Sequence, residues 1–69
     1  MNKQLGKNLE NALYRLVARA DTNGLTSTGN YKAPEFQELK KRGYFDSCRE
    51  FLNYSAQVRL SQKALGYFG

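Results

Sequence analysis

Apolar residues recur at a spacing of three and four positions near the start of the chain, which is typical of one face of an α-helix. Polar and basic residues, including Arg15 and Arg19, occupy the opposite face. Residues 21–24 then supply turn-forming side chains and a glycine that can take a positive φ and end a helix. The pattern predicts a long helix whose inner face consists of Leu5, Leu9, Ala12, Leu13, Leu16, Val17 and Ala20.

A second, shorter helix is predicted after a polar segment. Residues 25–33 are turn-rich and have room for one short helical turn at most. Pro34 suits the first turn of a helix, where its missing N–H costs nothing. Phe36 and Leu39 then have the spacing of an inward face, and Gly43 is a suitable residue to end the helix near Arg42.

Residues 44–60 permit two interpretations. Residues 47–50 (Ser-Cys-Arg-Glu) match a capping box that would start a helix. However, Tyr54, Ala56, Val58 and Leu60 alternate with polar residues, which is strand periodicity. We favour a hairpin that turns near residues 53–55 and pairs residues 44–52 with 56–60.

Ser61 is placed to cap a final helix, whose Ala64, Leu65 and Phe68 can face the core. The whole pattern predicts one α+β domain over residues 1–69. This domain contains a long first helix, a short second helix, a β-hairpin and a C-terminal helix. The alternative is an all-α bundle of four short helices.

The amino-acid composition limits which metal, disulfide and catalytic sites are expected. The 69 residues include one cysteine, Cys48, and no histidine. An internal disulfide, a zinc site of the usual Cys/His composition and an ordinary Ser-His or Cys-His catalytic pair are therefore not expected. We expect no enzymatic activity, no cofactor and no metal. The first ten residues lack the apolar region of a signal peptide, and no apolar run is long enough to span a bilayer, so a cytoplasmic protein without a membrane partner is expected.

The charge of the chain is compatible with a polyanionic partner, although many small basic proteins bind no nucleic acid. Eleven Lys and Arg against six Asp and Glu give a net charge of +5, and such a field speeds encounters with nucleic acids. The outward face of the second helix would present Gln37 and Lys41 to DNA. However, Glu35 and Glu38 on the same helix would repel phosphates. The alternative interpretation is a mixed-charge face that is simply solvated. The candidate contacts to double-stranded DNA are Lys32, Gln37, Lys40, Lys41, Arg42, Arg49, Arg59 and Lys63.

Two apolar motifs carry a family resemblance. They are Phe36-x-x-Leu39-x-x-x-Gly43-Tyr44-Phe45 and Val58-x-Leu60-Ser61-x-Lys63-Ala64-x-x-Tyr67-Phe68. Over roughly residues 9–68 the chain resembles the small winged-helix proteins of bacteria and phages, including the YjcQ-like type. The resemblance implies a recognition helix at residues 34–42 and a wing at 44–60. The chain departs from the pattern at Ala64, where glycine is usual, and at residues 25–33, which are too few for a full preceding helix.

Two functions are therefore weighed. The first is a DNA-binding transcriptional regulator of phage, prophage or plasmid type, with a homodimer as a candidate assembly. The second is a phage-type inhibitor or adaptor that binds a host protein through a basic and aromatic surface, with Tyr67 and Phe68 as an exposed anchor. Basic residues gathered on one face would favour the first function, whereas a helix at 46–53 would remove the wing.

Overall fold

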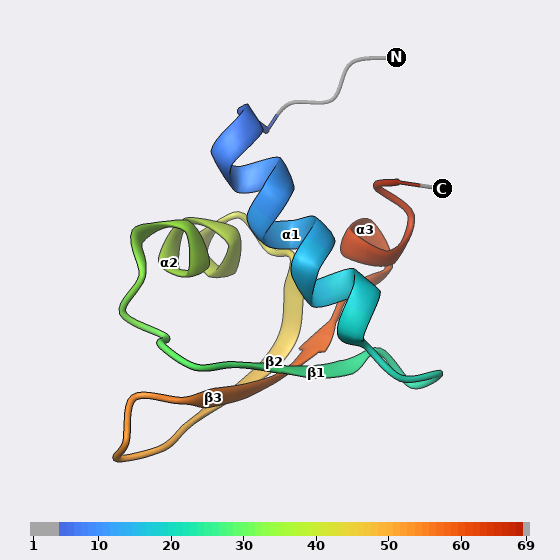
Figure 1. Cartoon of the computed structure of the whole chain (residues 1–69). Coiled ribbons are helices and arrows are strands. Elements are labelled where there is room, and N and C mark those ends of the chain that lie inside the picture. Colours follow the sequence, from blue (N-terminus) through green and yellow to red (C-terminus); the bar gives the residue numbers. More distant parts are fainter. Residues whose placement is uncertain (1–4, 69) are drawn as a thin grey trace.

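The computed structural model describes residues 5–68, which form a small α+β domain (Figure 1). The elements in chain order are α1 (Lys7–Arg19), β1 (Leu25–Thr28), α2 (Pro34–Lys41), β2 (Phe45–Glu50), β3 (Ala56–Leu60) and α3 (Gln62–Leu65). The strands form an antiparallel sheet in the order β1-β3-β2. In Figure 1 the helices lie on one side of this sheet. The predicted α+β class and hairpin are confirmed, and the all-α alternative is wrong.

The first helix buries the predicted apolar face. Leu13 and Leu16 are buried, and α1 ends with Ala20 as its C-cap. The carboxylate of Asp21 accepts the N–H groups of Asn23 and Leu25, which fixes the following turn. Gly24 takes a positive φ of 80° in that turn, close to the backbone of Leu60. The predicted glycine conformation is present, but it serves the entry into β1 instead of the end of the helix.

The strand β1 was not predicted. Its register pairs Thr26 with Val58 and Leu25 with Arg59, and both pairings are to β3. The expectation of an irregular segment or a helical turn over 25–33 is therefore wrong for residues 25–28. The segment has a single large apolar residue, so its own pattern is weak. Its backbone is satisfied by the ladder to β3, and threonine fits a half-buried strand.

The end of α2 follows the prediction closely. Pro34 lies in the first turn, and Arg42 is the C-cap. Gly43 has φ 85°, and its N–H donates to Lys40 O at 3.2 Å, while the Tyr44 N–H donates to Leu39 O at 3.1 Å. This pair of bonds is a Schellman motif, which satisfies carbonyls that the helix end would otherwise leave unpaired.

The hairpin of β2 and β3 places Cys48 opposite Val58, with an irregularity between Phe45 and Ser47. In the turn, the Phe51 N–H donates to Ser55 O at 2.9 Å and the Tyr54 N–H donates to Phe51 O at 3.1 Å. Because residues 45–50 form a strand, the capping-box pattern at 47–50 does not start a helix. The predicted pairing and the turn near 53–55 are confirmed.

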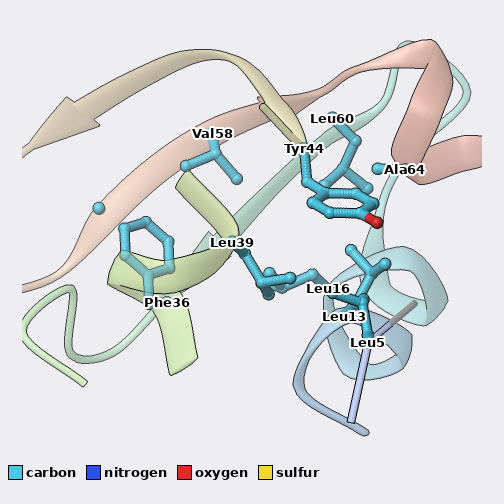
Figure 2. Close-up of a cluster of buried hydrophobic side chains, with 10 residues drawn as sticks. Leu5, Leu13, Leu16, Phe36, Leu39, Tyr44, Val58, Leu60 and Ala64 are labelled. Atoms are coloured by element: carbon cyan, nitrogen blue, oxygen red, sulfur yellow. The ribbon is translucent and has the colours of Figure 1, made fainter. Parts of the chain in front are cut away.

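The core joins the helices to the sheet. Leu13, Leu39 and Val58 are the largest fully buried side chains. Figure 2 shows Leu39 pointing toward Leu13 and Leu16 of α1, and the ring of Tyr44 beside Leu60 and Ala64. Within residues 5–68 no helix has the length and apolar character needed to cross a bilayer.

The final helix is a single turn held by Ser61. The Ser61 hydroxyl accepts the Ala64 N–H at 3.4 Å and donates to Gly43 O at 3.1 Å, so the predicted cap is present and also contacts the end of α2. Leu65 is 44% exposed, so its predicted inward position is wrong. Phe68 is half-buried and packs edge-on against Tyr14.

Candidate nucleic-acid interface

The outward face of α2 is polar, as its spacing predicts. Phe36 and Leu39 are buried, whereas Gln37 and Lys41 are exposed. The Gln37 side-chain amide donates to the carbonyl oxygen of Tyr31, which fixes its orientation at the start of the helix. Within the described residues, Lys41 has no side-chain hydrogen bond or ion pair. Lys41 is therefore the cation of α2 that is most available to a phosphate.

Two other cations of α2 are paired with carboxylates. Lys40 Nζ lies 3.1 Å from a carboxylate oxygen of Glu50, and Arg42 Nε lies 2.6 Å from one of Glu38. The hydrogen bond from Arg42 lowers the pKa of Glu38, and the hydrogen bond to Glu50 raises the pKa of Lys40. All four side chains are partly exposed, and such surface pairs exchange readily. A phosphate could therefore displace either carboxylate.

Lys32 lies beside the hairpin turn. Its Nζ is 4.6 Å from the centroid of the Tyr54 ring. The neighbouring Tyr31 N–H donates to Tyr54 O at 2.7 Å, and the two tyrosine rings are 6.0 Å apart. These contacts join the segment before α2 to the hairpin. The segment that leads into α2 is thus fixed to the hairpin turn, and both lie on the same side of the domain in Figure 1.

Arg49 and Arg59 lie on the other side of the sheet. Alternate residues of β3 are buried, with Val58 facing the helices and Arg59 exposed. Arg49 opposes exposed Gln57 and so shares this outer face. In residues 5–68 the Arg59 side chain has no hydrogen bond or ion pair. The predicted basic residues therefore do not gather on one face, because strand alternation turns these two arginines away from α2.

Lys63 has a role within the fold. Its Nζ donates to the carbonyl oxygen of Arg42 at 2.9 Å and lies 4.7 Å from the centroid of the Tyr44 ring. The ammonium group thereby satisfies a carbonyl at the negative end of α2. The charge of Lys63, which the sequence suggested as a DNA contact, therefore takes part in a contact within the fold.

The hairpin tip, defined as residues 51–55, was missed as a functional feature. Leu52 is 101% exposed, Tyr54 is 50% exposed and Phe51 is 40% exposed. Tyr54 has φ 69°, a left-handed conformation that costs a residue with a side chain roughly 1–2 kcal/mol. The Arg49 guanidinium lies 5.7 Å from the centroid of the Phe51 ring. The sequence signal for this feature was the pair Phe51-Leu52 directly before the turn predicted near residues 53–55, where polar residues are usual.

A groove of about 460 Å³ runs between α1 and the segment that leads into α2. Arg19 at its edge donates to Ser27 O at 2.8 Å. The polar row of α1 that the sequence indicated lies along this groove, opposite Glu35. The lining residues on α1 are Asn8, Asn11, Ala12, Arg15, Leu16 and Arg19.

The expected aromatic anchor at the end of the chain is not exposed. The Tyr67 hydroxyl donates to Glu10 at 3.0 Å and accepts the Leu5 N–H at 3.3 Å. Its ring packs against Phe68 at 5.0 Å between centroids. Tyr67 and Phe68 therefore pack against α1 and its N-terminal side, and the most exposed large apolar side chain among the described residues is Leu52 at the hairpin tip.

Little in the described residues suggests reaction chemistry. Burial raises the pKa of the half-buried Cys48 thiol, which keeps it protonated and weakly nucleophilic. Residues 5–68 contain no group of His, Cys, Asp and Glu side chains arranged to hold a metal ion. The candidate interface consists of α2, Lys32 and the hairpin tip. In comparisons with known proteins, no family model, no curated protein and no solved structure matches this chain.

Proposed function

We propose that this protein binds double-stranded DNA and acts as a small transcriptional regulator of phage, prophage or plasmid type. The observation that carries the proposal is that α2 and the segment before it are both joined to the β2–β3 hairpin of a basic domain. The Lys40–Glu50 ion pair joins α2 to β2, and the Tyr31–Tyr54 hydrogen bond joins the preceding segment to the hairpin tip. A surface of this kind can contact a groove of DNA and the phosphates beside that groove at the same time.

The element order supports a winged-helix-like arrangement. A helix, a strand, a second helix and a hairpin follow one another, and β1 pairs with the second strand of the hairpin. A turn over residues 30–33 stands where a longer version of the fold would have another helix. In this arrangement α2 is the recognition helix and the β2–β3 hairpin is the wing.

The exposed side chains have distinct roles in this proposal. Gln37 approaches base edges in the major groove, because its amide group matches the donors and acceptors there. Lys41, which has no carboxylate partner in the described residues, contacts a phosphate. Lys32 contacts a phosphate beside the hairpin, and Lys40 and Arg42 exchange their carboxylates for phosphates. Arg49 and Arg59, on the outer sheet face, contribute to the positive field that steers the encounter.

Fluorescence anisotropy with a labelled duplex of about 30 base pairs tests the proposal. If about four phosphates are contacted, affinity falls roughly a hundredfold between about 50 and 200 mM salt. Lys41→Ala should reduce the slope of this salt dependence by about 1. Lys7→Ala removes the same charge at the first residue of α1, outside the proposed interface, and should leave the slope unchanged. No binding at low salt, or equal effects of both variants, would contradict the proposal.

The alternative function is a phage-type inhibitor or adaptor that binds a host protein. The exposed Leu52, Phe51 and Tyr54 favour it, because aromatic and apolar side chains dominate protein interfaces. The carboxylates paired with Lys40 and Arg42 also lower the positive charge of α2. A pull-down from nuclease-treated lysate distinguishes the two functions. A stoichiometric protein partner that persists without nucleic acid would support the adaptor.

A further inference from the structure

The hairpin tip presents Leu52, its most exposed apolar side chain, on a firmly held turn. Leu52 has no contact that covers it, and its exposed fraction is 101%. The turn beneath it is fixed by two backbone hydrogen bonds, from the Phe51 N–H to Ser55 O and from the Tyr54 N–H to Phe51 O. The Asn53 side chain adds to this by accepting the N–H and the hydroxyl of Ser55 at 3.1 and 2.6 Å.

The same turn is also attached to the body of the domain. Tyr31 donates its N–H to Tyr54 O at 2.7 Å. Tyr54 holds the left-handed conformation that this turn requires although it has a side chain. The tip is therefore organised before any partner binds, so little conformational entropy is lost when Leu52 is inserted into a partner.

Two positively charged side chains lie over aromatic rings of the hairpin tip, in the same turn as Leu52. Lys32 lies over the Tyr54 ring at 4.6 Å and Arg49 over the Phe51 ring at 5.7 Å. Residues 51–55 contain no carboxylate, and the nearest in sequence, Glu50, is paired with Lys40. A suitable partner thus offers an apolar slot flanked by negative charge.

We propose that Leu52 is a wedge that enters the minor groove of duplex DNA and bends it by parting two stacked base pairs. This inference rests on the proposed DNA binding. A base-pair step offers an apolar interior between two lines of phosphates, which matches an apolar apex flanked by Lys32 and Arg49. Inserted apolar side chains of this kind unstack a step and kink the duplex by roughly 20–90°.

Energy transfer between dyes at the two ends of a duplex of about 30 base pairs tests the wedge. The wild-type protein should shorten the distance between the dyes when it binds. Leu52→Ala should bind roughly tenfold more weakly and leave the DNA nearly straight when saturated. Leu52→Phe keeps an apolar wedge and should keep the bend.

Leu65→Ala is the matched control, because Leu65 is 44% exposed on α3, away from the tip. Thermal unfolding of each variant should be close to wild type, since neither side chain is buried. Binding without a bend, or a bend that Leu52→Ala retains, would overturn the wedge and leave DNA binding standing. Absence of any duplex binding would overturn both. A tip that binds a purified protein partner through Leu52 while bound DNA stays straight would also overturn the wedge.

Discussion

The side-chain ammonium of Lys63 donates a hydrogen bond to the backbone carbonyl oxygen of Arg42, 2.9 Å away. This contact connects the single turn of α3 to the end of α2, where Gly43 reverses the chain. It also lies beside the bond from the Ser61 hydroxyl to Gly43 O. The last helix therefore stabilises the proposed recognition helix from its C-terminal end.

Replacing Lys63 by methionine should destabilise the fold by about 0.5–1 kcal/mol, because a charge–carbonyl contact at a helix C-terminus is lost. Urea unfolding measures this change. Lys63→Arg keeps the charge and should lose less. Lys63→Met should alter the salt slope of DNA binding only through the loss of one general charge, and Lys63→Arg should leave the slope unchanged. A specific loss of DNA affinity in Lys63→Arg would show that Lys63 contacts the DNA directly.

The hydroxyl of Thr26 gives a prediction of opposite sign. Thr26 is 7% exposed in β1, and its Oγ1 atom is buried without a hydrogen-bond partner in the described residues. Thr26→Val replaces the hydroxyl by a methyl group of similar size, so the free energy of unfolding should rise by about 1 kcal/mol. Thr26→Ala leaves a gap opposite Val58 and should be destabilising. Urea unfolding of the two variants distinguishes the cost of the unpaired hydroxyl from the stabilisation that the methyl group provides by packing.

Thr26 also illustrates what the sequence could and could not predict. Residues 56–60 alternate strictly and are bounded by a capped helix, so their strand was predictable. The strand at Thr26 was not, because its four residues gain their pairing only from β3, about thirty positions further along the chain. Local patterns carry no information on such distant partners.

Features of the candidate site also differ in whether the sequence could predict them. The inward face of α2 and its glycine end follow from local spacing and were predicted. The partner of Lys63 is a carbonyl 21 positions away, and only the fold brings the two together. The outward direction of Arg59 could have been predicted, since the alternation that buries Val58 and Leu60 also turns Arg59 from the helices.

Tyr67 predicts a change of stability at alkaline pH. Partial burial and the hydrogen bond to Glu10 raise the pKa of its hydroxyl above the ordinary 10.0. The stabilisation is therefore fully present below pH 10.0 and is lost as the pH rises through the raised pKa. In urea unfolding at neutral pH, the free energy of unfolding of wild type should exceed that of Tyr67→Phe. The difference between the two free energies should shrink in strong alkali. Tyr14→Phe, at a 59% exposed position, is the control for the loss of a tyrosine hydroxyl.

Glu38 should limit DNA binding, because its carboxylate is bound to Arg42 at 2.6 Å on the proposed recognition helix. Glu38→Gln removes one of the six negative charges, so the net charge rises from +5 to +6, and Arg42 becomes available to a phosphate. Duplex affinity at low salt should rise by roughly threefold to tenfold, with a steeper salt dependence. Asp46→Asn makes the same charge change at an exposed position of β2 and should raise affinity less. Equal gains in the two variants would mean that net charge alone governs binding, and α2 would lose its place in the interface.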